Sequence, residues 1–539
     1  MSFKRFGIML DMSRNAVMHV PALKKFIVTL SDMGYNTLLL YTEDTYEIPG
    51  EPYFGHFRGR YSQQELRQIV DFAGEQGMEV IPCIQTLAHL NAIFKWPVYN
   101  QIRDCNDILL ADEEKTYQLI GKMLDSVKAC YRSEYVHIGM DEAHMVGLGK
   151  HLDRFGYEDR FALLSRHLKR VCQMVTDRGL KPIMWGDMFF RLKNNGVYNC
   201  YEPIVPTPEE VDIPQEVAIT NWDYYSADQA RYEIMLRAHK QLGNPVWYAG
   251  GIWTWTGFAP DNAFSLRSTL AAIRACRVEN IENIFMTIWG DDGNECPRYA
   301  ALSALYAAAC FARGEESMEK IKADFEDKYH IPFDAFQLLD LHVPSDAMEA
   351  KNAVSCQEKY LLYNDPFLGI CDSTLSGKEN AYYARTAEAL KPYINHPEYG
   401  NTFRMLGQLA LVLSRKAELG VRTRALYQAA DKPGIRQLIA DYEQCILDTE
   451  AFLCIFRSVW MAENKPHGFE IQEIRIGGLI QRLRSCKERL EQWCSQDTPI
   501  PELAEQALDL EGGGTEFTRR HFRYPNWIAM FSPNVASMI

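Results

Sequence analysis

Two carboxylates stand side by side in the segment HIGMDEAH, residues 137–144, and this pair is the strongest chemical signal in the sequence. Cleavage of a glycosidic bond with retention of configuration needs two groups on the reacting sugar. One protonates the leaving oxygen, and the other stabilises the anomeric centre. Neighbouring side chains of a regular strand point to opposite faces, so Asp141 and Glu142 share a pocket only if the strand ends before them. Otherwise the two acids are a solvated pair or a helix cap.

Aromatic, acidic and basic residues follow several other apolar runs of the chain. Tryptophan offers a flat apolar face to the C–H face of a sugar, while acids and arginine bind its hydroxyl groups. The mixture suits a carbohydrate better than a phosphate or a purely apolar ligand. The candidate binding residues are Arg14, His89, His137, Trp185, Tyr224, Tyr225, Trp253, Trp255, Trp289 and Asp291. Alternation along a strand turns only one of the two neighbouring tyrosines inward, and the sequence leaves open which one.

Eight short apolar runs alternate with helical patterns up to about residue 315, which is typical of strands in a parallel sheet. The predicted strands are residues 6–12, 36–44, 79–86, 135–142, 181–187, 217–225, 245–253 and 283–292. The turn after the first run, DMSRN, lacks the glycine-rich phosphate loop of an open doubly wound sheet. We therefore predict an α/β fold, a (β/α)8 TIM barrel, whose active site lies at the carboxyl ends of the strands.

The strand pattern stops after about residue 335, and long amphipathic helical patterns follow over residues 401–420, 434–464 and 469–494. These patterns predict a helical bundle. We expect a catalytic barrel over residues 1–335 and an α-helical domain over residues 336–539.

The last 19 residues, HFRYPNWIAMFSPNVASMI, are unusually aromatic and apolar for a chain end. Such a segment, with Arg523, Tyr524, Trp527 and Phe531, needs a docking surface. We expect it to pack in a groove of the bundle, at the rim of the barrel mouth, or against a second copy of the chain in a homodimer.

Composition and charge exclude several classes of function. The chain carries 57 Lys and Arg against 71 Asp and Glu, a net charge of −14, which is the wrong sign for a nucleic-acid partner. No stretch reaches the roughly 18 apolar residues that a membrane span requires. The apolar run before Asp11 is too short for a signal peptide, so we expect a cytoplasmic protein without a membrane partner.

Cysteine and histidine spacing gives no sign of a metal site. The 14 cysteines are scattered without a C-x-x-C pair, so we expect reduced thiols. His144 and His151 lack the spacing of metal ligands, and we expect them to be ordinary surface or helix residues. No metal and no cofactor are expected.

Four segments resemble motifs of glycoside hydrolase family 20, the β-N-acetylhexosaminidases. HIGMDEA resembles the H-x-G-G-D-E motif, and GIMLDMSRN resembles the first strand with its sugar-binding arginine. IPCIQTLAHL resembles the third-strand motif that ends in histidine, and MTIWGDD resembles the Trp-x-acid of the eighth strand. Three positions depart from the pattern: Met140 replaces the second glycine, Cys83 a common glutamate, and Asp291 a usual glutamate. The helical half resembles a smaller bacterial branch of this family.

The resemblance implies an exo-β-N-acetylhexosaminidase that removes terminal GlcNAc or GalNAc from an oligosaccharide or glycoconjugate. In this family the 2-acetamido carbonyl of the substrate is the nucleophile and forms an oxazolinium intermediate. Asp141 would hold the acetamido N–H and stabilise the charge of the intermediate. Glu142 would act as the general acid and then as the general base.

The resemblance also implies roles in sugar binding. Arg14 would clamp the 3- and 4-hydroxyls, unless it is only a strand-end ion pair, and Asp291 would bind the 4- and 6-hydroxyls, unless it caps a helix. Two or three of the four tryptophans would form an acetamido box, with Tyr224 or Tyr225 donating to the acetamido carbonyl. His89 and His137 would orient the two carboxylates or touch the substrate.

Three other functions remain in competition. An enzyme that releases a disaccharide, as a lacto-N-biosidase does, needs a larger pocket, and the grip of Arg14 and Asp291 on a terminal sugar argues against it. A glycan-binding barrel without catalysis would have no need of the Asp141–Glu142 pair. A scaffold protein that acts through its helical half is the third alternative.

Overall fold

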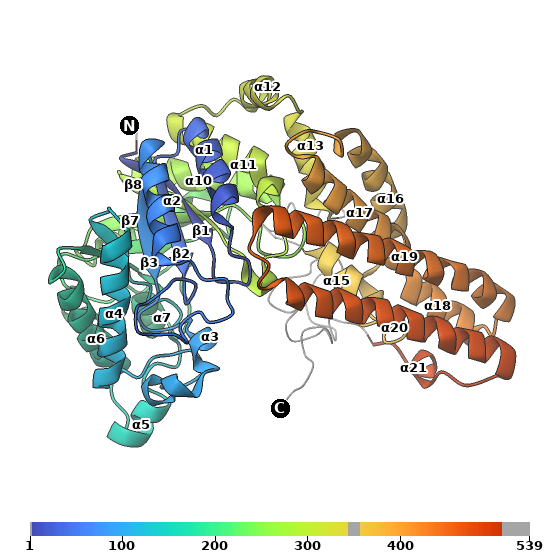
Figure 1. Ribbon diagram of the computed structural model, residues 1–539, viewed down its shortest axis with the longest axis horizontal. Helices are drawn as coiled ribbons and strands as arrows, with labels where there is room; N and C mark the ends of the chain where they lie inside the picture. Colours follow the sequence, from blue (N-terminus) through green and yellow to red (C-terminus); the bar gives the residue numbers. More distant parts are fainter. Residues whose placement is uncertain (1–2, 343–355, 509–539) are drawn as a thin grey trace. The chain divides into compact units, whose positions relative to one another are not determined.

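The computed structural model describes residues 3–342 and 356–508. Eight parallel strands form a closed barrel in sequence order, and β1 pairs with β8 to complete it (Figure 1). The strands are β1 Arg5–Asp11, β2 Thr37–Thr42, β3 Glu79–Ile84, β4 Tyr135–His137, β5 Lys181–Trp185, β6 Ala218–Trp222, β7 Val246–Gly251 and β8 Asn283–Ile288. The predicted (β/α)8 TIM barrel and its eight strands are confirmed.

The strands are buried on both faces, which explains why they read as continuous apolar runs in the sequence. All six residues of β2 are buried, for example. Each observed strand ends before its predicted range does. The residues just after the strands are also buried, but they have left the sheet.

Helices connect successive strands and lie around the barrel (Figure 1). They include α1 Val20–Met33, α2 Gln63–Glu75, α3 Asn91–Phe94, α4 Glu114–Cys130, α5 Lys150–Phe155, α6 Arg160–Thr176, α7 Asp187–Lys193, α8 Pro208–Val211, α9 Gln229–Lys240, α10 Asn262–Val278 and α11 Leu302–Arg313. Two of these helices show ordinary capping. Helix α2 begins with a capping box between Ser62 and Glu65, and α1 ends at Gly34, whose φ is 98°.

The chain divides into two compact units that do not follow the linear order of the sequence. The first contains residues 1–252, 265–289 and 306–316, and so holds all eight strands. The second contains residues 253–264 and 290–305 together with the chain from residue 317 onward. The two short pieces of this second unit are the segments that follow β7 and β8.

The second unit is helical, which confirms the predicted helical C-terminal region. Its described helices are α12 Met318–Tyr329, α13 Phe333–Gln337, α15 Gln357–Tyr363, α16 Glu379–Leu390, α17 Gly400–Lys416, α18 Leu419–Gln428, α19 Lys432–Glu463, α20 Phe469–Gln496 and α21 Pro501–Ala504. Helices α19 and α20 run alongside each other (Figure 1). No helix within the described residues has both the length and the apolar character that a membrane crossing requires. Arg523, Tyr524, Trp527 and Phe531 of the aromatic chain end lie outside the described residues.

Candidate active site

The Asp141–Glu142 pair lies on an irregular turn directly after the shortest barrel strand. Strand β4 ends at His137, and the backbone of Gly139, Met140 and Glu142 then adopts positive φ angles of 74°, 72° and 50°. Such left-handed conformations are unusual for residues other than glycine and concentrate at functional sites. Met140 occupies a position that favours glycine, which is the residue that the family motif has there. The turn takes both carboxylates out of the strand.

Asp141 is buried and held through both of its carboxylate oxygens. Gln85, which follows β3, donates from Nε2 to Oδ1 at 2.7 Å, while Nε2 of His89 lies 3.2 Å from Oδ2. Burial alone raises the pKa of Asp141, but the His89 charge and the hydrogen bonds from His89 and Gln85 outweigh it and lower the pKa below its usual range. Asp141 is therefore an ionised carboxylate inside the barrel mouth.

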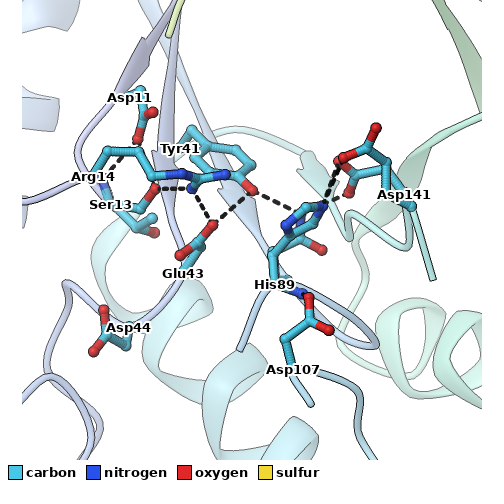
Figure 2. Close-up of polar contacts among 12 residues, drawn as sticks. Asp11, Ser13, Arg14, Tyr41, Glu43, Asp44, His89, Asp107 and Asp141 are labelled. Carbon is cyan, nitrogen blue, oxygen red and sulfur yellow. Dashed lines mark hydrogen bonds and ion pairs between the residues drawn. The ribbon is translucent and has the colours of Figure 1, made fainter. Parts of the chain in front are cut away.

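His89 carries the positive charge that balances Asp141. Burial lowers its pKa, but the adjacent Asp141 carboxylate more than reverses this and raises the pKa to about 10. Its backbone N–H donates to Oδ2 of Asp107 at 2.9 Å (Figure 2). Nε2 also lies 3.8 Å from Oε2 of Glu142. The imidazolium thus lies against both carboxylates of the pair.

Glu142 is the more accessible of the two acids, since 40% of its side chain is exposed against 12% for Asp141. Arg191 of α7 donates from Nη2 to Oε1 of Glu142 at 3.3 Å and from Nε to Oδ2 of Asp187 at 3.0 Å. The backbone N–H of Glu142 donates to the same Asp187 oxygen at 3.1 Å. Asp187 is fully buried, and burial, with the nearby Asp141 charge, raises its pKa to about 7.

Asp187 and Arg191 were not among the predicted site residues. The sequence position of each residue could have identified it as a site residue. Asp187 follows β5 after a single glycine, at the carboxyl end where barrel active sites form. Arg191 lies four residues later on α7, so that the two side chains share one face of this helix.

A chain of polar contacts connects Arg14 with Asp141 (Figure 2). Arg14 makes an ion pair with Glu43, whose Oε1 accepts a hydrogen bond from the Tyr41 hydroxyl at 3.2 Å. Nε2 of Gln85 donates to that hydroxyl at 2.9 Å and also to Asp141. The ion-pair alternative for Arg14 is therefore present in the structure. Its role as a sugar clamp stays a prediction. Glu43, Tyr41 and Gln85 were not predicted as site residues.

Aromatic rings lie beside the polar chain. The ring of Trp289 is 4.8 Å from that of Tyr41 and 6.2 Å from that of Trp185, and Trp185 lies 4.4 Å from His137. Nδ1 of His137 accepts the N–H of Gly139 at 3.2 Å, and burial lowers the pKa of this imidazole to about 3. His137 is therefore neutral and supports the turn and Trp185, in contrast to the charged His89.

The tyrosines after β6 lie beyond Arg191. Its guanidinium is 5.6 Å from the ring of Trp222, which stacks on Tyr224 at 5.6 Å. The rings of Tyr224 and Tyr225 are 4.8 Å apart, and Tyr224 is the more buried of the two. A series of contacts through Trp222 and Arg191 therefore links both tyrosines to Glu142. Trp222 was not among the predicted site residues.

Three predicted binding residues belong to the second unit. Trp253 and Trp255 follow β7 and stack on each other at 4.2 Å, and Asp291 begins the short turn after β8. Their participation in the same site as Asp141 stays a prediction.

Two groups of described residues bring acids and a histidine within reach of one cation, Asp112–His151–Glu158 and Asp261–Asp340–His342. Arg166 already bridges the two acids of the first group. In the second group, Asp340 accepts backbone N–H groups at the start of α10. His151 is a helix residue of α5 and is buried, with its ring 4.9 Å from that of Phe155.

Two family models match most of the chain. Residues 3–242 match the model described as "Glycosyl hydrolase family 20, catalytic domain", and residues 334–520 match "Glycoside Hydrolase 20C C-terminal domain". The chain belongs to glycoside hydrolase family 20. The resemblance seen in the sequence motifs is thus confirmed, and the helical region matches a domain of the same family.

The chain is similar to several proteins of this family at low identity. Human hexosaminidase D is 24% identical over 274 residues, which cover 48% of this chain and 54% of that protein, so the match spans about half of its length. Bovine hexosaminidase D is 24% identical over 255 residues, covering 45% and 67%. Among solved structures, a β-N-acetylhexosaminidase from Bacteroides fragilis is 20% identical with a TM-score of 0.47, and covers 60% of this chain and 69% of its own.

Proposed function

We propose that this family 20 protein is an exo-β-N-acetylhexosaminidase with a retaining, substrate-assisted mechanism. The observation that carries the proposal is the contrast between its two neighbouring acids. Asp141 is buried and ionised between Gln85 and His89, while Glu142 is accessible and touches Arg191. An ionised acid suits stabilisation of a positive intermediate, and an accessible one suits proton exchange with a leaving group and with water.

In the first step the acetamido carbonyl oxygen attacks the anomeric carbon and the glycosidic C–O bond breaks. The proton of Glu142 passes to the departing oxygen. The product of this step is an oxazolinium ion, whose N–H faces Asp141 in our proposal. The fixed negative charge of Asp141 needs no reorganisation as positive charge develops, which favours the transition state over the ground state.

In the second step water attacks the anomeric carbon, the ring C–O bond of the oxazolinium breaks, and Glu142 takes up the water proton. Glu142 carries a negative charge between the two steps. Arg191 lies 3.3 Å from its Oε1 and would stabilise that charge. The buried Asp187 beneath Arg191 holds the guanidinium in place.

Turnover of three chromogenic substrates side by side tests this function. We expect hydrolysis of the 4-nitrophenyl β-glycosides of GlcNAc or GalNAc and none of the β-glucoside, because the glucoside has no acetamido group to attack. A stable thiazoline analogue of the intermediate should inhibit at concentrations far below KM. Comparable turnover of the glucoside would remove substrate assistance. Absence of all turnover would favour the glycan-binding alternative.

The exo character needs a separate test with an oligosaccharide substrate. A chitooligosaccharide labelled at its reducing end should lose one GlcNAc at a time from the other end. Release of a disaccharide from the start would instead support the lacto-N-biosidase-like alternative. We also propose the cytoplasmic location and the homodimer, which cell fractionation and light scattering would test.

A further inference from the structure

The two loops that carry Trp253, Trp255 and Asp291 pack together with the helical C-terminal region. We define the β7 loop as residues 253–261 and the β8 loop as residues 290–297. Both belong to the second unit. Barrel loops at the carboxyl ends of strands bind substrate in TIM-barrel enzymes. The contacts of these loops with α15, α19 and α20 therefore bear on substrate binding.

The β8 loop is held by buried charges of the helical region. Nζ of Lys359, on α15, lies 2.8 Å from Oδ2 of Asp292 and 2.7 Å from Oε2 of Glu295. Arg475, on α20, donates to the backbone oxygen of Asp292 at 2.7 Å and lies 3.2 Å from Oε1 of Glu295. Lys359 is 1% exposed. Two cations and two acids are thus paired at largely buried positions, where removal of one partner leaves an uncompensated charge.

The turn that these charges hold contains the predicted sugar-binding acid. Asp292 follows Asp291 directly and has a left-handed φ of 61°. Gly293 has a φ of 129°, and a Cβ there would come within 2.8 Å of Nε2 of Gln472 and 3.0 Å of Nη1 of Arg475. Gln472 also donates to the Gly293 oxygen at 3.3 Å. The backbone on either side of Asp292 is therefore fixed by α20.

The β7 loop is held by the residue that precedes Lys359. Oε1 of Glu358 accepts the N–H of Ala259 at 3.4 Å, and a Cβ on Gly257 would overlap with that same carboxylate. Phe258 is fully buried, with its ring 5.4 Å from Phe452 and 5.7 Å from Phe456 of α19. The neighbouring residues Glu358 and Lys359 of α15 thus contact both loops between them.

We propose that α15 and α20 position these two loops for the terminal sugar, and that Lys359 and Arg475 are positioning residues that act through Asp291. This inference rests on the proposed function, because it assigns Asp291 to a sugar hydroxyl. It gives the helical region a direct role in substrate specificity. Loss of either cation should release the turn at Asp292 and weaken the contact of Asp291 with the 4- or 6-hydroxyl.

The test compares Lys359→Met with wild type on 4-nitrophenyl β-GlcNAc and on its 4-deoxy and 6-deoxy analogues. Wild type should turn over at least one deoxy analogue about tenfold less efficiently, because a charged acceptor has lost its partner. We call the kcat/KM for 4-nitrophenyl β-GlcNAc divided by that for the deoxy analogue the ratio. Lys359→Met should bring this ratio closer to one. A smaller folded fraction would lower all rates equally and leave the ratio unchanged, so the ratio separates positioning from stability.

Three further variants complete the design. Arg475→Gln should shrink the ratio as well, and it replaces Lys359→Met if that variant does not fold. Lys359→Arg should restore much of the ratio. Arg489→Met is the matched control, since Arg489 is also on α20 but pairs with Glu502 of α21, at 2.5 and 2.7 Å. It should keep the wild-type ratio.

The outcomes separate this inference from the proposed function. An inactive wild type would contradict the proposed function and this inference with it. An active wild type that treats all three substrates alike would overturn the role of Asp291 and hence the inference alone. The inference is also wrong if Lys359→Met and Arg475→Gln keep the full wild-type ratio.

Discussion

The guanidinium of Arg191 donates a hydrogen bond to Oε1 of Glu142 at 3.3 Å, across the gap between the β5 and β4 ends of the barrel. A cation beside the proposed general acid stabilises the carboxylate that remains after proton transfer. Its Nε donates to Asp187, which lies one helical turn earlier, at 3.0 Å. One guanidinium thus connects Glu142 with the buried Asp187.

Replacement of Arg191 by methionine should lower kcat/KM by about 10- to 100-fold, the range expected for one charge-assisted hydrogen bond. The loss should be greater on substrates with poor leaving groups, because proton transfer matters more there. Arg191→Lys should keep part of the activity. The matched control is Arg5→Met, which breaks a part-buried ion pair with Glu79 at the other end of the barrel. Equal losses in Arg191→Met and Arg5→Met would show that Arg191 acts only on stability.

Glu142→Gln tests the general acid directly. The variant should lose about 10²- to 10⁴-fold in turnover of substrates with poor leaving groups, the usual contribution of a positioned acid. It should lose much less on 4-nitrophenyl substrates, because an activated leaving group needs little protonation. Glu134→Gln, which changes the same chemical group at the exposed start of β4, should behave as wild type. A loss of the same size on both substrate types would contradict the acid role.

The barrel could be predicted from the sequence because its strands are buried on both faces and read as uninterrupted apolar runs. The strand ends could not be placed. The run from Tyr135 continues to Glu142 in the sequence, whereas β4 ends at His137. Burial does not stop where hydrogen bonding between strands stops, and apolar character reports burial only.

The acidic pair was found because its two residues are adjacent, so the signal is local. Its partners were missed because they come from other strands. Gln85 contacts Asp141 across 56 positions of sequence, and Arg191 contacts Glu142 across 49. Lys359 was hidden in a different way, since a lysine is usually exposed, but this one is buried in ion pairs.

Gly139 offers a test of how Gln85 positions Asp141. A Cβ at this residue would overlap with Oε1 of Gln85 and would lie 2.9 Å from the backbone oxygen of Ile84. Gly139→Ala should therefore displace Gln85 from Asp141 and lower kcat/KM by at least about tenfold, as for other losses of a buried charged contact. Gly77→Ala is the control, because Gly77 has the same φ of 74° but open space around it. Both variants carry similar backbone strain, so similar kinetics in the two would contradict a role for Gln85.

Because of Asp187, the free energy of unfolding should decrease as the pH rises towards 7. Its pKa is about 7 in the folded chain against about 3.9 for an unfolded aspartate. Between these values the folded state binds a proton that the unfolded state has lost, so its contribution to stability is complete below about pH 4 and is lost as the pH rises through 7.

Asp187→Asn removes this contribution but keeps an oxygen that can accept from Glu142 and Arg191. The thermal midpoint of the variant should therefore fall less between pH 5 and pH 8 than that of wild type. Each pH unit within the window corresponds to at most about 1.4 kcal/mol of unfolding free energy. Asp125→Asn, which changes an exposed carboxylate of α4, should follow the wild-type curve. Parallel curves for Asp187→Asn and wild type would mean that Asp187 is ionised throughout, and the ion pair with Arg191 would then hold its negative charge permanently beneath Glu142.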